Sequence, residues 1–296
     1  MRIVDSHQHV FWHGRDDQEL IRDMDAHGIE NSWLLTWEIP PDHNDLTYHA
    51  VLNPAHMRSD GTHSGIPLSD LLKARDKNPD RFTLGYCPDP RLETAQDLFE
   101  AAVKMFNVRV CGEWKFRINI DDPCCIRLFR KAGLLRCPVV LHLDIPWLPN
   151  SKGEMEFQKN WHGGTIHNLE SVLKVCPEVN FIGHGPGFWR EISGDAIKSS
   201  HMYPSDPIKE EGGIHRLFRE NENLYGDLSA GSGLNAINRD RVHAKNFLEK
   251  FSDRLLFGRD YYGSELIEAM NELELSNSTK RNIFSANALR LLAIEY

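Results

Sequence analysis

The stretch Asp-Ser-His-Gln-His at residues 5–9 ends the first apolar run of the chain, which begins at Ile3. In an extended strand, side chains two residues apart point to the same side, so His7 and His9 turn two imidazoles toward one point. Paired imidazoles of this kind commonly form half of a site for a divalent metal. Because the chain contains 15 histidines, a His-x-His pattern also arises by chance, and the interpretation depends on the later motifs.

Three later apolar runs each end on a residue that can bind a metal: His142, His184 and Asp260. Strand-like and helix-like segments alternate along the whole chain, and the expected strands lie at residues 3–10, 33–36, 82–86, 108–118, 139–143, 179–183, 224–228 and 255–257. Strict alternation predicts a parallel sheet, and eight repeats favour an α/β protein with a (β/α)8 TIM barrel. An open doubly wound sheet is the alternative.

The length of 296 residues fits a single barrel domain spanning residues 1–296, because such barrels commonly use about 250 residues. Their active sites lie at the C-terminal ends of the strands, where the loops to the helices emerge. The four histidines and the aspartate all fall at these ends, and long loops are expected on the same face after the second, fifth and sixth strands. This common position argues against a chance pattern.

The charge balance excludes some partners. Lysine and arginine number 34 and aspartate and glutamate 43, so the formal net charge is 34 − 43 = −9, and no basic run is present. We therefore expect neither a nucleic-acid nor an acidic-membrane partner. No apolar stretch approaches the length of a membrane span and the N-terminus runs directly into a strand, so a cytoplasmic protein is expected.

Taken together, the motifs resemble the amidohydrolase superfamily, in particular its amidohydrolase-related branch (amidohydrolase 2), which includes hydrolases, lactonases and aromatic-acid decarboxylases. The resemblance spans nearly the whole chain and depends on the order and spacing of short motifs. These are Asp-Ser-His-Gln-His at 5–9, Gly-Glu-Trp-Lys at 112–115, Asp-Asp-Pro at 121–123, Pro-Val-Val-Leu-His at 138–142, Phe-Ile-Gly-His-Gly at 181–185, Leu-Leu-Phe-Gly-Arg-Asp at 255–260 and Asn-Ala-Leu-Arg-Leu-Leu at 287–292.

The resemblance implies a role for each matching position. His7 and His9 match the metal ligands of the first strand, and His142 matches the ligand of the fifth. Asp260 matches an aspartate that binds metal and, in hydrolases, takes a proton from the attacking water. His184 matches a histidine that binds a second metal in binuclear members and serves as an acid, a base or a polarising group in mononuclear ones.

The fourth strand leaves two interpretations open. Binuclear relatives place a carboxylated lysine or a glutamate there as a bridging ligand, and this chain offers both Glu113 and Lys115 on one face. The alternative is an inward Lys-Glu ion pair that supports a single metal. The sequence favours one divalent ion, with zinc the first choice and manganese or iron also suited to these ligands.

The resemblance implies a hydrolase that acts on a small-molecule ester, lactone or amide through a metal-activated water, with Asp260 as general base and His184 stabilising the oxyanion. A metal-dependent decarboxylase of an aromatic or enol acid is the alternative. A metal-bound barrel without catalytic activity, used for binding, is a third and less favoured interpretation. The resemblance also implies a homodimer.

Four further residues enter the predicted site. Asp5 shares a face with His7 and is expected to orient an imidazole by accepting its hydrogen bond. Arg117 and Arg190 are expected on the substrate side, where their guanidinium groups could bind a carboxylate, although surface ion pairs are the commoner role. Asp227 ends the seventh strand and is likewise expected on the substrate-side rim. Two motifs depart from the family pattern: Gly-Arg-Asp-Tyr-Tyr at 258–262 and His-Gly-Pro-Gly at 184–187.

Overall fold

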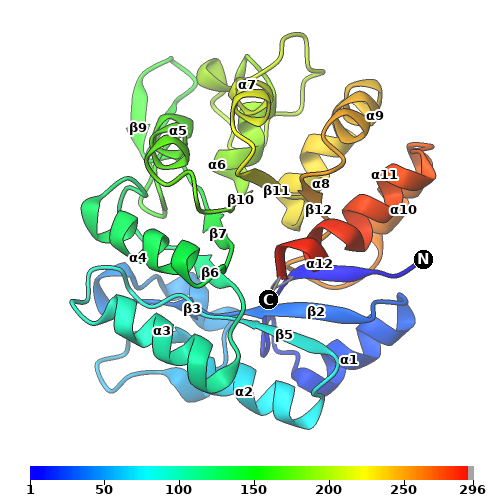
Figure 1. Cartoon of the computed structure of the whole chain (residues 1–296). Helices are drawn as coiled ribbons and strands as arrows, with labels where there is room; N and C mark the ends of the chain where they lie inside the picture. The colour runs from blue at the N-terminus through cyan, green and yellow to red at the C-terminus, as the bar shows by residue number, and fades with distance from the viewer. Residues whose placement is uncertain (293–296) are drawn as a thin grey trace.

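Eight parallel strands form the centre of the computed structural model, which describes residues 1–292 (Figure 1). They pair in two arcs, in the orders β1-β2-β5 and β6-β7-β10-β11-β12, and every pairing within these arcs is parallel. The strands are β1 (Val4–Gln8), β2 (Asn31–Leu35), β5 (Phe82–Gly85), β6 (Cys111–Trp114), β7 (Val139–His142), β10 (Phe181–His184), β11 (Leu224–Asp227) and β12 (Leu255–Leu256).

Backbone hydrogen bonds join the two arcs on both sides. Between β5 and β6, the Tyr86 N–H donates to the Val110 carbonyl at 3.0 Å. Between β12 and β1, the Ser6 N–H donates to the Phe257 carbonyl at 2.9 Å. The predicted (β/α)8 barrel is therefore confirmed.

Helices surround the barrel and bury one apolar face each against the outside of the strands (Figure 1). The first is typical: the Asp16 side chain accepts a hydrogen bond from the Glu19 N–H, and Leu20 and Met24 of the same helix are buried. The helices are α1 (Asp17–Ala26), α2 (Leu68–Lys77), α3 (Ala95–Phe106), α4 (Pro123–Leu134), α5 (Ile166–Val175), α7 (Gly213–Glu220), α8 (Ala230–Asn238), α9 (Arg241–Lys250), α10 (Glu265–Glu272), α11 (Asn277–Arg281) and α12 (Asn287–Leu292).

A second, smaller cluster of apolar side chains fills the barrel interior. The strands contribute Val4, Trp33, Leu35, Val110, Val140, Ile182, Tyr225 and Leu256. Ala288 and Leu291 of α12 pack against this cluster, so the C-terminal helix adds to the interior core. This packing fills the barrel away from the strand ends that carry the predicted ligands.

The three expected long loops are present and partly ordered by structure of their own. The loop after β2 contains the pair β3 (Trp37–Glu38) and β4 (Gly65–Ile66), and the loop after β7 contains the hairpin of β8 (Trp147–Pro149) and β9 (Met155–Phe157). The loop after β10 begins with the short helix α6 (Pro186–Trp189). Within residues 1–292, no helix is both long and apolar enough to cross a membrane.

The segment after β11 is helical over most of residues 230–250. It forms two helices, because Asp240 ends α8 and caps α9 by accepting a hydrogen bond from the His243 N–H at 3.0 Å. The small-residue stretch at 229–233 forms the N-terminal end of α8. A Cβ at Gly233 would overlap the Leu228 carbonyl, so a glycine is needed for this close approach to the end of β11.

Candidate metal centre

The predicted ligands converge at the C-terminal ends of the barrel strands. His7 and His9 come from the end of β1, and Asp260 from the loop after β12. The other members are Glu113 on β6, His142 on β7 and His184 on β10, and all but Asp260 are buried. The sequence therefore predicted this grouping correctly, although Glu113 was only one of two residues considered on the fourth strand.

Glu113 lies between two sets of histidines. Its Oε2 atom is 3.5 Å from Nε2 of His9, whereas its Oε1 atom is 2.7 Å from Nδ1 of His142 and 3.7 Å from Nε2 of His184. The ligand atoms of His7, His9 and Glu113 lie within 4.8 Å of one another, and so do those of Glu113, His142 and His184. One carboxylate is thus shared by two potential ligand sets.

Asp260 faces the same centre from the opposite side. Its Oδ1 atom is 3.5 Å from Nε2 of His9 and 3.9 Å from Nε2 of His7, and its Oδ2 atom is 3.7 Å from Nε2 of His184. The residue adopts a left-handed conformation with φ of 50°, which aspartate tolerates better than most residues. A hydrogen bond from its backbone N–H to the His7 carbonyl, at 2.8 Å, fixes this loop to β1.

These residues fit a divalent metal. The Nε2 atoms of His7 and His184 and the Oδ1 atom of Asp260 are buried without a hydrogen-bond partner in the described chain, although buried polar atoms are normally paired. Burial alone would lower the pKa of His7, but the carboxylates of Asp227, Asp260 and Glu113 outweigh it and raise this pKa to about 9. The centre therefore favours a positive charge, and its nitrogen and oxygen donors suit zinc, manganese or iron.

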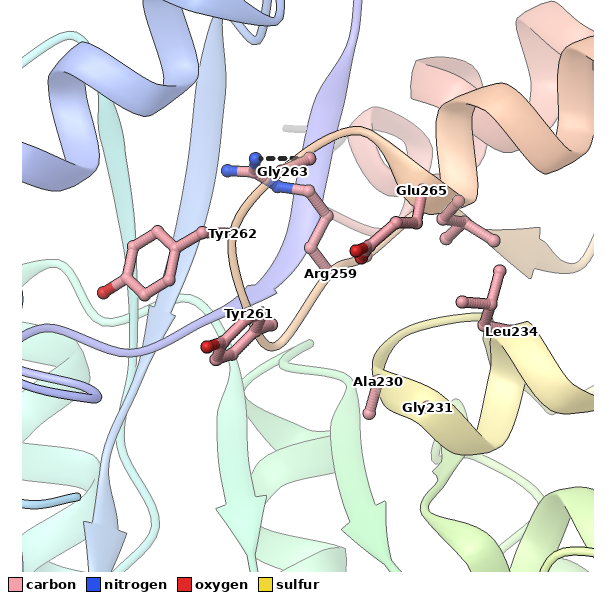
Figure 2. A pocket seen from close by; sticks show the side chains of 10 residues that line it. Ala230, Gly231, Leu234, Arg259, Tyr261, Tyr262, Gly263 and Glu265 are labelled. Atoms are coloured by element: carbon pink, nitrogen blue, oxygen red, sulfur yellow. Dashed lines mark hydrogen bonds between the residues drawn. The ribbon is translucent and has the colours of Figure 1, made fainter. Parts of the chain in front are cut away.

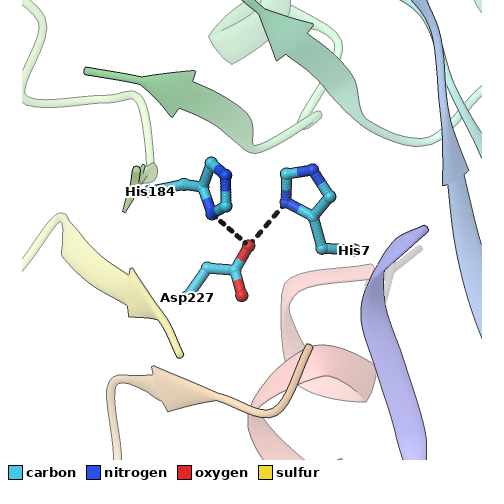
Figure 3. Close-up of side chains that lie close together, drawn as sticks. All are labelled: His7, His184 and Asp227. Atoms are coloured by element: carbon cyan, nitrogen blue, oxygen red, sulfur yellow. Dashed lines mark hydrogen bonds and ion pairs between the residues drawn. The ribbon is translucent and has the colours of Figure 1, made fainter. Parts of the chain in front are cut away.

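Asp227 contacts two of the histidine rings through their Nδ1 atoms, on the side opposite the Nε2 atoms that face the metal centre (Figure 3). Its Oδ2 atom lies 2.6 Å from Nδ1 of His7 and 3.3 Å from Nδ1 of His184, and it accepts a hydrogen bond from the Ser229 hydroxyl at 2.9 Å. Burial opposes ionisation of Asp227, but the His7 ring outweighs it and holds the pKa of this carboxyl well below its ordinary value. The prediction of a substrate-side role for Asp227 is therefore wrong, because its carboxylate is occupied by ligand histidines.

Asp144 holds a third ring and was not predicted from the sequence. Its Oδ2 atom lies 2.9 Å from Nε2 of His142 and 2.9 Å from Nδ1 of His162, a buried histidine in the loop before α5. If Nε2 of His142 and Nδ1 of His162 both donate to this carboxylate, the Nδ1 lone pair of neutral His142 faces Glu113 and the metal centre. The only sequence signal was the two-residue spacing of Asp144 from His142.

Two glycines set the turn that follows His184. Gly185 has φ of 90°, and a Cβ there would lie 2.9 Å from the Leu143 carbonyl oxygen. A Cβ at Gly187 would lie 2.6 Å from the same oxygen, whereas its own N–H donates to that carbonyl at 2.7 Å. The His-Gly-Pro-Gly sequence therefore allows the start of α6 to pack closely beside β7.

Asp5 does not contact an imidazole, so the expected role is corrected. It accepts hydrogen bonds from Nε of Arg259 at 2.7 Å, from the Arg259 backbone N–H at 3.0 Å and from the His7 backbone N–H at 3.2 Å. Arg259 also donates to Asp23 at 2.5 Å. The arginine in the unusual Gly-Arg-Asp-Tyr-Tyr motif is thus a buried ion-pair residue that fixes β1 to the loop after β12.

The other basic residues have distinct surroundings. Lys115 makes no direct ion pair with Glu113, but its charge acts against the effect of burial and helps to hold the pKa of that carboxyl well below its ordinary value. Its Nζ atom lies 4.1 Å from the centre of the Trp37 ring. Arg117 donates to the Asn160 side chain at 3.0 Å, and Arg190 donates to the carbonyls of the loop after β10. The substrate-side role predicted for Arg190 is therefore wrong, because its buried guanidinium supports the loop.

Aromatic residues from the loops after β1 and β2 border the metal centre. The Trp12 indole N–H donates to the Asp260 carbonyl at 2.9 Å, and its ring centre lies 5.6 Å from that of His9. Trp37 lies 6.0 Å from Trp12 and 4.7 Å from Tyr48, measured between ring centres. These rings form an apolar wall that extends from the loop after β1 to the loop after β2.

A separate cavity of about 230 Å³ lies between the loop after β12 and the start of α8 (Figure 2). Its lining includes Gly231, Arg259 and Tyr261, and none of the predicted metal ligands. Asp260 lies between two lining residues in the sequence, yet its carboxylate faces the histidines instead. This cavity is therefore distinct from the metal centre.

No protein-family model matches this chain, and no curated protein matches its sequence. Solved structures do match its fold. An uncharacterised TIM-barrel protein from Bordetella bronchiseptica is 17% identical with a TM-score of 0.63, and the match covers 99% of this chain and 98% of that chain. A dihydroxybenzoic acid decarboxylase from Polaromonas, with bound manganese and the inhibitor 2-nitroresorcinol, is 18% identical with a TM-score of 0.60, covering 98% and 96%.

A third similar structure is a protein provisionally assigned as a 2-pyrone-4,6-dicarboxylic acid hydrolase, from Pseudomonas putida. It is 13% identical with a TM-score of 0.57, and the match covers 99% of each chain. At such identities the likeness is one of fold. This chain therefore shares, over nearly its full length, the TIM-barrel fold of these proteins.

Proposed function

We propose that this protein is a metal-dependent hydrolase of the amidohydrolase-related branch that acts on a small-molecule ester, lactone or amide. The observation that carries the proposal is the position of Glu113, whose two carboxylate oxygens face two sets of histidines. A carboxylate in this position is suited to bridging two ions, and paired ions are typical of many hydrolytic centres. The sequence favoured one ion, and the position of Glu113 leads us to propose two.

In this proposal His7, His9 and Asp260 would hold one ion, His142 and His184 would hold the other, and Glu113 would serve both. Zinc is the first choice for both positions. When bound, such ions supply a water of lowered pKa and polarise a substrate carbonyl. The surrounding carboxylates Asp227 and Asp144 keep the ligand rings in the required orientation through the hydrogen bonds described above.

Asp260 moves the proton. Its Oδ1 atom faces His7 and His9, which leaves Oδ2, 3.7 Å from Nε2 of His184, to accept a proton from the attacking water and to return it to the leaving group. The aromatic wall of Trp12 and Trp37 excludes bulk water on one side of this carboxylate. His184 would thus be a metal ligand in this proposal, and not the group that stabilises the oxyanion.

Decarboxylation of an aromatic or enol acid is the second candidate. It is favoured by the Polaromonas fold relative, which is a manganese-containing decarboxylase, although the identity of 18% supports likeness of fold alone. In that reaction one ion suffices to anchor the substrate, and Asp260 or His184 protonates the ring carbon before carbon dioxide leaves. The number of bound ions therefore separates the two candidates.

The test is metal content per chain, measured by elemental analysis of protein purified without added metal. We expect about two ions in the native protein and a loss of at least one in Glu113→Gln, since the bridge is neutralised. Glu154→Gln, in the exposed turn between β8 and β9, is the matched control and should retain both.

Activity completes the test. The native protein is assayed on a panel of small esters, lactones and amides, and carbon dioxide release is assayed on dihydroxybenzoates. Hydrolysis with two ions supports the proposal. One ion with carbon dioxide release would replace the hydrolase by the decarboxylase.

A further inference from the structure

Lys115 carries a positive charge beside the metal centre. No residue in the described part of the chain forms a hydrogen bond or a direct ion pair with its ammonium group. Lys115 directly follows the last residue of β6 and lies two positions after Glu113. Its ammonium group lies 4.1 Å from the centre of the Trp37 ring, and the carboxylates of Glu113, Asp144 and Asp260 act on its charge from beyond ion-pair distance. A partly buried ammonium group without a direct ion-pair partner costs free energy, because charged groups lose solvation on burial.

The carboxylates near Lys115 are already engaged by other groups. Glu113 lies 2.7 Å from the His142 ring, and Asp144 contacts both His142 and His162 at 2.9 Å. Asp260 faces the ligand histidines. Once divalent ions occupy the centre, Glu113 and Asp260 are neutralised further, and Lys115 remains as a cation without a counterion.

The aromatic rings beside Lys115 and its positive charge suit the anionic edge of a flat substrate. The Trp37 ring beneath the ammonium fixes its position by a cation–π contact, and Tyr48 extends the same apolar wall. A flat molecule that lies along this wall with its scissile carbonyl at the metal centre brings its distal edge to Lys115. The chemistry expected at that edge is anionic, since a single ammonium on a flexible stem binds a carboxylate as a point charge.

We propose that Lys115, supported by Trp37, binds a carboxylate of the substrate that is distinct from the group reacting at the metal centre. This inference depends on the proposed function for the position of the reacting group. It specifies the substrate class as a flat carboxylic acid that also carries the hydrolysable ester, lactone or amide.

The test compares two rigid probes on the metal-loaded protein by isothermal titration calorimetry. Isophthalate carries two carboxylates, of which one can reach the metals and the other Lys115, whereas benzoate carries only one. We expect isophthalate to bind roughly 10- to 100-fold more tightly than benzoate, as a charge-assisted hydrogen bond predicts. Lys115→Met should abolish this preference and Lys115→Arg should retain most of it.

Lys174→Met is the matched control, because Lys174 lies on the outer face of α5 and pairs with Glu170 on the same helix. It should leave the preference unchanged. The proposal is overturned if native protein shows no preference, if Lys115→Met keeps it, or if Lys115→Met loses metal, which would make Lys115 part of the centre itself. A preference lost in Lys115→Met with metal intact, but without hydrolysis of any panel substrate, would support the carboxylate site while contradicting the hydrolase.

Discussion

Oδ2 of Asp227 lies 2.6 Å from Nδ1 of His7, across 220 positions of sequence. Because the carboxylate can only accept, His7 must carry its proton on Nδ1, and its Nε2 lone pair then points to the metal centre. The Ser229 hydroxyl connects the same carboxylate to Nδ1 of His184 through contacts of 2.9 Å. The end of β11 thus determines how two ligands from β1 and β10 are presented.

Asp227→Asn is therefore expected to weaken metal binding by roughly 10- to 100-fold, because an amide can donate as well as accept and no longer fixes the His7 tautomer. The measurement is competition with a coloured chelator at constant pH. Asp253→Asn, an exposed change near β12, is the control and should bind metal like the native protein. Native affinity in Asp227→Asn would show that the His7 ring is positioned by other contacts.

Asp260→Asn tests the proton transfer. The amide keeps the shape and the hydrogen bond of the backbone N–H to the His7 carbonyl, but it cannot accept a proton at neutral pH. Turnover on any panel substrate should fall by at least about 10²-fold, which is the lower range for general acid–base catalysis. Metal content is measured on the same sample, so that a loss of activity with metal retained identifies the proton step. Full turnover by Asp260→Asn would refute the role.

The ligands were predictable because their positions follow from local rules. Period-two spacing places His7 and His9 on one face, and the barrel rule places His142, His184 and Asp260 at one end. The residues behind them were not predictable in the same way. Asp5 was assigned to an imidazole and Asp227 to the substrate side, whereas Asp227 contacts the imidazoles and Asp5 does not, since which carboxylate reaches which ring depends on strand stagger and on turns that sequence patterns do not specify.

Arg259→Ala should destabilise the fold rather than alter the chemistry directly. The guanidinium is buried between Asp5 and Asp23, with contacts of 2.7 and 2.5 Å, and its removal leaves Asp5 charged and unpaired in the barrel. Removing one partner of such a buried pair costs roughly 3–5 kcal/mol of unfolding free energy. The measurement is chemical denaturation followed by circular dichroism.

Arg241→Ala provides the comparison for Arg259→Ala. Its ion pair with Glu272 lies on the surface, so the loss should stay below about 1 kcal/mol. Equal effects of the two substitutions would mean that the Asp5–Arg259 pair contributes no more than a surface ion pair.

His215 should make the stability of the protein depend on pH in the acid range, independently of the metal centre. This buried side chain packs against Phe247 and Phe251, with ring centres 5.0 and 6.2 Å away, and burial lowers its pKa from the ordinary 6.5 to about 4. Between these values the unfolded chain binds a proton that the folded chain excludes. The contribution is therefore fully present above pH 6.5 and is lost as the pH falls through 6.5 toward 4, by roughly 2–3 kcal/mol.

The difference between the native protein and His215→Phe reports the contribution of His215 together with its contact to His243, whose Nε2 atom lies 3.0 Å from Nε2 of His215, because the metal centre is the same in both proteins. Urea denaturation at a series of pH values should give a native protein that loses unfolding free energy faster than His215→Phe as the pH falls below 6.5. Phenylalanine suits the aromatic surroundings and removes the titrating ring. Parallel curves for the two proteins would contradict the prediction, since they would show that the His215 ring binds its proton equally well in the folded and unfolded chains.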